Sequence, residues 1–305
     1  MSDTQSIGIR KMLLSIAALL AVYYGTKFCA PIITDAFHLD SYYTGLCIRA
    51  VASIACFVAL GGLGSLSWLK FDLKAVGHAW RFLGYIIIVY IAMGVFSFSI
   101  TAGTIPEAER GALTAAEALR NLLYITGLCV IVGINEEAMF RGLLFGGLLA
   151  GINGSRHSAL WAAIISSVIF GFFHVMSDLN PEDPLTLAQG LMKTLQTGTV
   201  GLFLCVTVIE DHRLCGAMST HGFTDWVVML SSVLTGFEGV GSYVNTDPQV
   251  AASGIVLYAI MCVIYLPKTI QSIRRLLKVE DPEYGPFLQS VAPQSQDHSQ
   301  GRHFA

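Results

Sequence analysis

The feature that most limits the fold of this chain is a series of about eight long apolar blocks separated by short polar connections. A helix needs roughly 17 to 25 apolar residues to cross the hydrocarbon core of a bilayer. Only 13% of the 305 residues are charged, whereas soluble domains carry about 25%. Unpaired backbone groups cannot face lipid, so the blocks predict an all-α, polytopic transmembrane helical bundle.

The blocks place the predicted spans at about 12–28, 46–69, 82–103, 121–150, 158–176, 186–209, 214–234 and 250–267. The first block lacks an A-x-A cleavage site, so we expect it to be retained as a span and not removed as a signal peptide. Turn signals lie between blocks, as in NPEDP at 180–184 and NTDP at 245–248. We expect one integral membrane domain over 1–279 and a polar, disordered tail over 280–305.

Basic residues are concentrated in alternate connections. They lie before the first span, between spans two and three, four and five, and six and seven, and after the eighth, whereas 177–185 and 235–249 contain no Lys or Arg. Cytoplasmic connections carry the excess of Lys and Arg, so we expect both termini in the cytoplasm. The net charge of −3 gives no reason to expect a nucleic-acid partner. The lipid bilayer is therefore the first expected partner.

Several conspicuous residues have structural explanations. The seven cysteines are scattered through the apolar blocks without a metal-type or disulfide-type spacing, so we interpret them as packing residues. Gly142 and Gly146 have the small-residue spacing of a helix contact, which would equally suit a homodimer. Arg49 and Lys193 lie near span ends, where long side chains reach the interface, and we assign them no chemistry.

The sequence NEEAMFR places Glu136, Glu137 and Arg141 inside an apolar block. Ionisable residues at bilayer depth are costly and indicate a functional site with a partner. On a helix Glu137 and Arg141 share a face and can pair, whereas Glu136 points about 100° away. The alternative interpretation is a packing clamp between helices, or a pair at the membrane interface.

Two further blocks carry polar residues at the same helical spacing. FGFFH ends with His174, and Phe170 lies one turn earlier, where its ring can pack on the imidazole. STHGFTDW places His221 and Asp225 four residues apart, a spacing that can orient an imidazole. Taken alone, either histidine could be interfacial or a satisfied core residue. Together with Glu136, they form a set that can activate water, directly or through a metal.

The ordered set E-E-x-x-x-R, F-x-x-x-H and H-x-x-x-D, over about 136–225, resembles the CPBP family of intramembrane proteases. This is the CAAX prenyl endopeptidase and bacteriocin-processing group, often called Abi proteins in bacteria. The eight-span plan is also similar to that of the CAAX endopeptidase. The resemblance implies a hydrolase of the bacterial inner membrane whose core protease region covers about 121–234.

The resemblance also implies roles for the two glutamates. Glu136 would be the general base that takes a proton from the attacking water, and His174 would help to hold that water. Glu137 would pair with Arg141 and fix the helix so that Glu136 faces the cavity. His174 in turn would be positioned by the ring of Phe170.

His221 would polarise the scissile carbonyl and stabilise the oxyanion, assisted by Asp225. The family often has Asn at this last position. An Asn amide donates hydrogen bonds and an ionised Asp cannot. Asp225 would therefore orient His221, or be protonated itself.

The resembled family has been described both as glutamic proteases and as metalloproteases. The chain has no H-E-x-x-H spacing, so a metal-free, glutamate-activated water is favoured and no cofactor is expected. The alternative is a catalytic zinc ion held by Glu136, His174 and His221 with one open position.

Function classes other than proteolysis stay open from the residues alone. A proton-coupled transporter could use Glu136 and His174 as a relay, although broken spans in matching halves are not evident. A non-proteolytic membrane binding or immunity protein could keep the same fold. For a protease, the substrate could be a peptide or a membrane protein: prenylated CAAX termini, peptide pheromones, bacteriocin leaders and membrane-protein segments all fit.

Overall fold

The structure is a computed structural model that describes residues 3–38, 41–105, 113–235, 243–279 and 287. Its helices are α1 (Asp3–Phe37), α2 (Ser41–Gly62), η1 (Leu66–Leu69), α3 (Leu73–Thr104), α5 (Ala115–Glu137), η2 (Ala138–Phe145), α6 (Gly146–Gly151), α7 (Ser158–Phe173), α8 (Pro184–Asp211), α9 (Cys215–Met229), α10 (Ser232–Thr235) and α11 (Pro248–Leu276). The described residues contain no β-strand. The predicted all-α helical bundle is confirmed.

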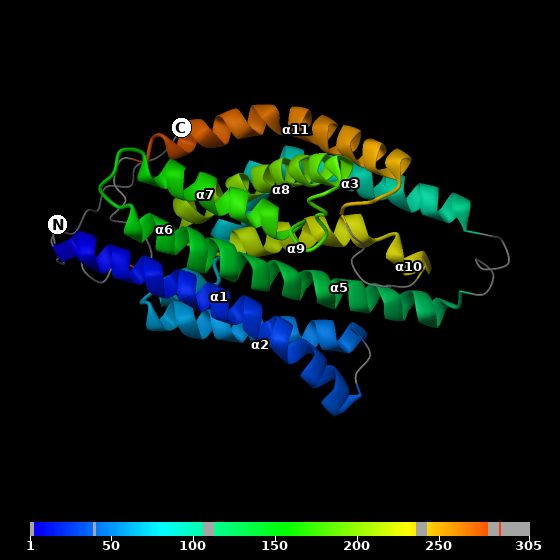
Figure 1. Ribbon diagram of the computed structural model, residues 1–305, viewed down its shortest axis with the longest axis horizontal. Helices are drawn as coiled ribbons and strands as arrows, with labels where there is room; N and C mark the ends of the chain where they lie inside the picture. The colour runs from blue at the N-terminus through cyan, green and yellow to red at the C-terminus, as the bar shows by residue number, and fades with distance from the viewer. Residues whose placement is uncertain (1–2, 39–40, 106–112, 236–242, 280–286, 288–305) are drawn as a thin grey trace.

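The helices run back and forth along the long axis of the molecule (Figure 1). The start of α1, the α2–α3, α6–α7 and α8–α9 connections and the end of α11 lie at one end of the bundle. The end of α1, the start of α2, the α7–α8 connection, the end of α10 and the start of α11 lie toward the other end. The alternate connections that carry the Lys and Arg residues are therefore on the same side of the bundle.

The eight predicted spans all contain helix, but they are not equally long. Six described helical segments are long and apolar enough to cross a membrane: 5–37, 43–62, 73–104, 115–151, 184–211 and 248–276. The predicted spans 158–176 and 214–234 correspond to α7 and α9, which have 16 and 15 residues. Because crossing requires about 20 residues, α7 and α9 are too short to span as straight, isolated helices.

The predicted turn signals mark helix starts. Asp183 precedes Pro184 and its side chain accepts a hydrogen bond from the Leu185 amide at 3.0 Å. Asp247 caps α11 in the same way, before Pro248. A capping acid followed by proline is favourable because the first helical amides need acceptors and the proline nitrogen needs none.

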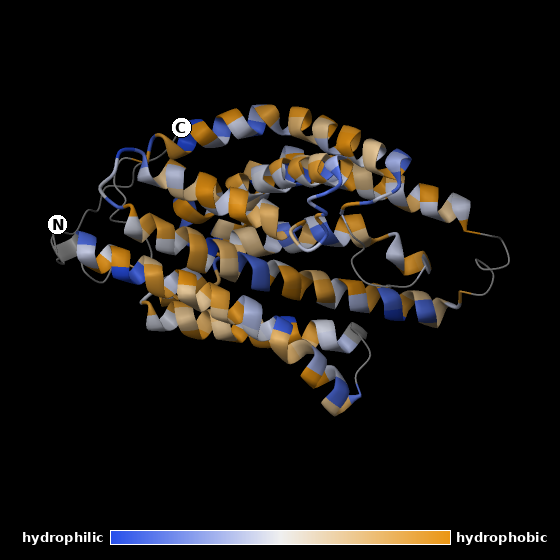
Figure 2. Cartoon of the chain, in the orientation of Figure 1, coloured by the Kyte–Doolittle hydropathy of each residue, from blue (hydrophilic) through white to orange (hydrophobic). Residues whose placement is uncertain are grey.

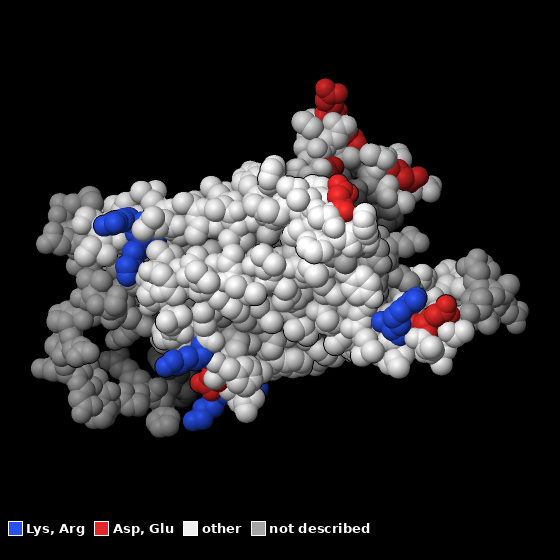
Figure 3. All heavy atoms as spheres, turned by 90° about the horizontal axis from the view of Figure 1, so that it is seen from below, with Lys and Arg blue, Asp and Glu red and all other residues white. Residues whose placement is uncertain are grey.

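The outside of the bundle is apolar. Many large hydrophobic side chains are exposed, among them Val51, Ile54, Val58, Ile88, Phe96, Leu123, Val130, Val168, Leu191, Val256 and Val263. Hydrophobic residues predominate along the helices in Figure 2. On the face shown in Figure 3, acidic and basic side chains gather toward the two ends and leave an uncharged band between them. A surface of this kind suits lipid and would aggregate in water.

The helix α8 lies at the centre of the bundle and α1 at its edge. In the most apolar 18-residue window of each helix, 67% of the residues are buried in α8 and 6% in α1. The side chains of α8 therefore meet other helices, whereas most of those of α1 face outward. A polar side chain on this buried part of α8 is therefore enclosed by the protein.

A π-helical segment, η2, interrupts the long helix directly after Glu137. At its end the Gly146 amide donates to the carbonyl of Arg141, five residues earlier. The hydroxyl groups of Ser15 and Ser166 donate to the Leu143 and Phe140 carbonyls, respectively. All eight residues of the segment are buried. π-helical segments inside α-helices are rare and are frequently found at functional sites.

The glycine pair at 142 and 146 lies inside the bundle. Gly142 is buried, and a Cβ atom there would lie 2.9 Å from Leu60 and 3.4 Å from Leu214 of the same chain. Gly146 is also buried, so this glycine pair serves contacts within the chain and is not a surface for a homodimer.

The predicted disordered tail 280–305 lies outside the described residues except Phe287, which is buried and accepts a hydrogen bond from the Lys11 ammonium.

Candidate active site

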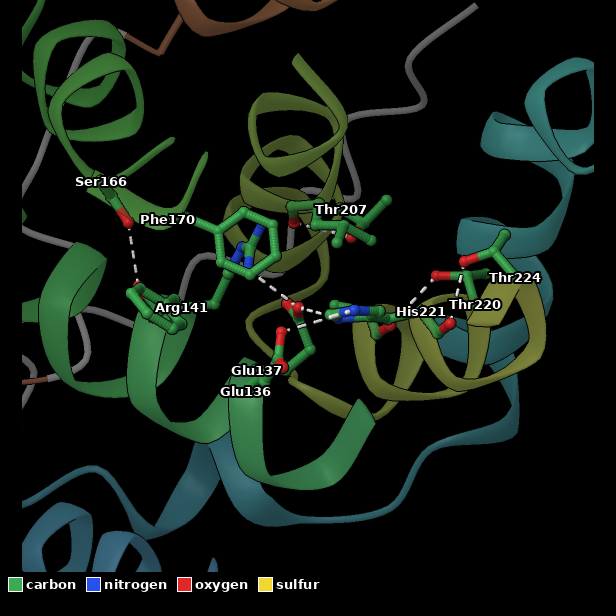
Figure 4. Close-up of polar contacts among 12 residues, drawn as sticks. Glu136, Glu137, Arg141, Ser166, Phe170, Thr207, Thr220, His221 and Thr224 are labelled. Atoms are coloured by element: carbon green, nitrogen blue, oxygen red, sulfur yellow. Dashed lines mark hydrogen bonds and ion pairs between the residues drawn. The ribbon is translucent and has the colours of Figure 1, made fainter. Parts of the chain in front are cut away.

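Glu137 is the centre of the buried polar cluster. Its Oε1 atom accepts a hydrogen bond from Nη1 of Arg141 at 2.9 Å, the pair expected from their helical spacing. Both side chains are buried, with 0% of Glu137 and 1% of Arg141 exposed. Such a pair is retained in an apolar interior only when the two charges neutralise each other with good geometry. Figure 4 shows Glu137, Arg141, Phe170 and His221 converging from α5, η2, α7 and α9.

The aromatic ring of Phe170 joins the members of the site. The guanidinium carbon of Arg141 lies 4.1 Å from the centre of this ring. The imidazoles of His174 and His221 contact it edge-on, with ring centres 4.6 Å and 5.8 Å away. Phe170 thus packs on His174 as its spacing predicts, and it also covers Arg141, which sequence spacing did not indicate.

Glu137 has a second partner that the sequence analysis missed. Nδ1 of His221 donates a hydrogen bond to Oε1 of Glu137 at 2.7 Å. Asp225, which we expected to orient His221, lies 3.5 Å from Nε2, the other nitrogen of that imidazole. The two residues of the 2.7 Å bond are 84 positions apart, and no local spacing could reveal it.

Close packing of α5 against α9 makes this bond feasible. A Cβ atom on Gly133, one turn before Glu137, would lie 2.8 Å from the amide nitrogen of Gly222 and 2.6 Å from the Met218 carbonyl. The two helix backbones therefore touch beside the site. Glycine is required at such an approach because any side chain would push the helices apart.

Indole hydrogen bonds fix α9 on both sides. The indole nitrogen of Trp80, on α3, donates to the Ser219 hydroxyl at 3.1 Å. The indole nitrogen of Trp226, on α9, donates to the Thr126 hydroxyl of α5 at 3.0 Å. These contacts hold the helix that presents His221.

Glu136 lies between the two histidines. Its Oε2 atom is 3.6 Å from Nε2 of His174 and 3.7 Å from Nε2 of His221. Its side chain is 25% exposed, in contrast to the enclosed Glu137. The Oε2 atom itself is inaccessible and has no hydrogen-bond partner among the described residues. This carboxylate oxygen lacks the hydrogen bonds that buried polar groups normally accept, and a water molecule or a substrate that enters the site would supply them.

The backbone fixes the tautomer of His174. Its Nδ1 atom lies 2.9 Å from the Phe170 carbonyl oxygen, which can only accept. Nδ1 must therefore carry a hydrogen, and in the neutral imidazole Nε2 presents its lone pair toward Glu136. Two acceptors thus face each other, an arrangement that a water molecule can satisfy by donating both of its hydrogens.

His174 and His221 approach the same carboxylate although the sequence placed them at different distances from the basic connections. By counting residues from Arg213, His221 should lie closer to the basic end than His174 does. However, Leu214 and Trp68 are both fully buried, and the Leu214 amide donates to the Trp68 carbonyl at 3.0 Å. The helix α9 therefore begins inside the protein, and both imidazoles reach the same Glu136 carboxylate.

The suggested zinc ligands do not form a metal site in this geometry. Glu136 faces both His174 and His221, but the described part of the chain contains no group of three or more His, Cys, Asp or Glu side chains arranged to hold a metal ion. A tetrahedral zinc site needs its protein ligands to point at one common position. We therefore derive no step through a metal.

Comparison with known proteins agrees with the motifs. Residues 118–227 match a family model described as type II CAAX prenyl endopeptidase Rce1-like. The matched segment contains the seven residues of the predicted site, and this finding agrees with the resemblance to CPBP proteases. Neither the curated proteins nor the solved structures gave a match to the chain. The similarity supports a protease, that is, a hydrolase acting on peptide substrates in the bilayer.

Proposed function

We propose, from the similarity of residues 118–227 to type II CAAX prenyl endopeptidases, that the chain is an intramembrane endopeptidase in which Glu136 activates the attacking water. The observation that carries this proposal is the free Oε2 atom of Glu136, held 3.6 Å and 3.7 Å from the Nε2 atoms of His174 and His221. A carboxylate with two imidazoles at hand suits general acid–base catalysis.

In this mechanism a water molecule contacts Glu136 and His174. It donates one hydrogen to the Glu136 carboxylate and the other to Nε2 of His174, whose Nδ1 is held by the Phe170 carbonyl. As the water oxygen attacks the scissile carbonyl carbon, its proton passes to Glu136. Glu136 then gives that proton to the leaving nitrogen as the C–N bond breaks, and the products are an amine and a carboxylic acid that retains the second proton of the water until it ionises.

His221 supplies the electrophilic side of the reaction. Its Nδ1 atom donates a hydrogen bond to Glu137. Its Nε2 atom lies 3.5 Å from a carboxylate oxygen of Asp225 and 3.7 Å from one of Glu136. Three carboxylates around one imidazole favour the doubly protonated ring, whose Nε2 hydrogen can then be donated to the substrate carbonyl. Preorganised donors of this kind stabilise the oxyanion that develops in the transition state.

Asp225 in this proposal is an acceptor that supports the positive charge on His221. Its side chain is 35% exposed, the most accessible of the site carboxylates. An ionised Asp does not donate to the oxyanion itself, in contrast to the Asn often found in the resembled family. The negative charge of Asp225 acts on the reaction through His221.

We also propose how the protease lies in the membrane. Residues 1–279 would form one membrane domain, with the core protease region at about 121–234 and both termini in the cytoplasm. The proposal is supported by the basic residues of alternate connections, which lie at one end of the bundle.

The test of the mechanism is the Glu136→Gln variant. Peptides and membrane proteins that accumulate in cells with the variant, relative to the wild type, identify substrates, which are then assayed in proteoliposomes. We expect the variant to lower kcat at least about 100-fold, because general-base catalysis contributes roughly 100- to 10,000-fold. Unchanged turnover by a stably inserted variant would refute the role of Glu136.

Glu117→Gln is the matched control on the same helix. Glu117 accepts hydrogen bonds from the Thr114 amide and hydroxyl at the exposed start of α5. Glutamine retains this capping role, so the control should keep wild-type turnover. A loss of activity in both variants would indicate damage to α5 and not the loss of a base.

A further inference from the structure

Lys193 of α8 is a charged residue that the mechanism above does not use. Its Nζ atom lies 4.2 Å from the ring centre of Tyr243 and 5.2 Å from that of Tyr258. Nζ also donates a hydrogen bond to Oε1 of Gln196 at 3.2 Å. The side chain is partly buried, and these contacts give Lys193 defined surroundings that the sequence analysis did not assign to it.

Among the described residues the Lys193 ammonium forms no ion pair with a carboxylate, and the nearest charge effect on it is a longer-range electrostatic interaction with Asp225. None of the ion pairs in the described part of the chain includes Lys193. Two aromatic rings and one amide oxygen attract a cation but do not neutralise it. A partly buried cation in this state favours binding of an anion, because a charge removed from water is costly unless it is paired.

The surroundings of Lys193 are fixed by bonds between separate elements. Gln189 of α8 accepts a hydrogen bond from the Asn245 amide at 2.7 Å, and the Tyr258 hydroxyl donates to the Tyr243 carbonyl at 3.3 Å. These bonds attach the segment before α11 to α8 and to α11 itself, and they fix the backbone of Tyr243. The cation site is therefore built by the fold and does not depend on one flexible side chain.

This site borders the catalytic groups. The ring of Tyr243 lies 6.1 Å from the ring of His174, and Lys193 interacts electrostatically with both His174 and Asp225. Through Tyr243, Nζ is no more than about 10 Å from the imidazole of His174. Because extended residues span roughly 3.3–3.6 Å each, about three residues of a bound peptide cover that distance.

We propose that Lys193 is a specificity-determining residue that pairs with a carboxylate of the peptide substrate, held within about three residues of the scissile bond. The inference rests on the proposed peptidase function and adds a recognition element to it. Glu136 and Asp225 place negative charge in the site beyond the paired Glu137, so a substrate carboxylate needs a cation beside it. Arg141 cannot serve, because it is buried and paired with Glu137.

Arg49 is the rival cation. It interacts electrostatically with Glu136, and its Nη1 atom donates to the Gly45 carbonyl at 3.3 Å. However, the aromatic rings and amide that surround Lys193 have no counterpart around Arg49 in the described contacts. The structure therefore favours Lys193.

The carboxylate could be the free C-terminus of the peptide or an Asp or Glu side chain. A peptide cleaved in a Glu136-dependent manner is prepared as the C-terminal acid and as the C-terminal amide. It is also prepared with each acidic side chain changed to its amide. Each acid and amide pair is supplied together in proteoliposomes, and the ratio of their kcat/KM values is measured.

We expect the wild type to prefer one acid over its amide by about 10- to 100-fold, the range of a charge-assisted hydrogen bond. In Lys193→Met the preference should fall below about threefold, mainly through KM, whereas Lys193→Arg should largely retain it. Because the ratio is taken within one preparation, partial misfolding of a variant does not change it. Discrimination lost at the C-terminal pair identifies the terminus as the source, and discrimination lost at a side-chain pair identifies that side chain.

Lys268→Met is the matched control. The Nζ atom of Lys268 lies 4.2 Å from the Phe82 ring and donates to Gln271, three residues later, as Lys193 does to Gln196. This variant should discriminate as the wild type does. Equal cleavage of every acid and amide pair by the wild type would overturn the role of Lys193 and leave the peptidase function intact.

Two other results would also overturn it: discrimination retained in Lys193→Met, or discrimination abolished in Arg49→Met and not in Lys193→Met. If no peptide is cleaved in a Glu136-dependent manner, the peptidase function fails, and the role of Lys193 fails with it. The two failures are thus distinguishable.

Discussion

At the scale of residues, Glu137 links stability to catalysis. One oxygen atom of its carboxylate accepts hydrogen bonds from both Arg141 and His221. The same charge that balances a buried guanidinium therefore orients the imidazole proposed to stabilise the oxyanion. Substitutions of this group should separate the two effects.

Arg141→Met should destabilise the protein by about 3–5 kcal/mol, because it leaves the Glu137 carboxylate buried without its guanidinium. Thermal unfolding in detergent measures the loss. In the double variant Glu137→Leu with Arg141→Met, both charges are gone and much of the stability should return. Turnover should stay low in the double variant, since Nδ1 of His221 has lost its acceptor. Recovery of both stability and turnover would show that Glu137 is only a packing clamp.

Local spacing predicted part of this site and could not predict the rest. The Glu137–Arg141 and Phe170–His174 contacts lie within single helices, where residues four apart share a face. The His221–Glu137 bond and the position of Glu136 between two histidines depend on how α5, α7 and α9 meet. The surroundings of Lys193 depend in the same way on Tyr243 and Tyr258.

At the scale of elements, the distance between α5 and α9 sets the geometry of the site. The contact of Gly133 with the backbone of Gly222 is one turn from the Glu137–His221 bond. Gly133→Ala should move the helices apart and lower kcat by roughly 10- to 100-fold, since displacement of a catalytic group by about 1 Å can cost 100-fold. The prediction is tested by measuring kcat on a substrate that was identified with the Glu136→Gln variant.

Gly127→Ala is the control for that change, on the same helix. A Cβ atom at Gly127 would have nothing within 4 Å. Alanine there should leave turnover at the wild-type value and favour the helix by up to about 1 kcal/mol. If Gly133→Ala were equally harmless, close packing of α5 on α9 would not be what positions His221.

The π-helical segment could not be predicted from hydrophobic pattern. Its residues, AMFRGLLF, are all buried. The segment therefore has no alternation of polar and apolar faces from which the number of residues per turn could be predicted. What selects the wide turn is tertiary: carbonyl groups of the segment accept hydrogen bonds from Ser15 of α1 and Ser166 of α7. The sequence analysis therefore treated 121–150 as one regular helix.

At the scale of the whole molecule, the sequence predicted the arrangement well because lipid leaves few alternatives. Apolar length fixed where helices form, and the basic connections predicted which ends lie together, as the structure has them. Span length was less predictable. The helix α9 is short because it begins at Leu214, which is fully buried inside the bundle.

The orientation of the bundle gives the last prediction. Ser155 and Glu182 are both exposed, in the α6–α7 and α7–α8 connections at opposite ends of the bundle. With both termini cytoplasmic, Glu182→Cys should react with a membrane-impermeant thiol reagent added outside intact cells, and Ser155→Cys should react only after the cells are opened. Because Cys29 and Cys47 are exposed, labelling is read as the increase over the parent protein. The reverse labelling pattern would show that the protein has the opposite orientation. The basic end of the bundle would then face outward, against the positive-inside bias.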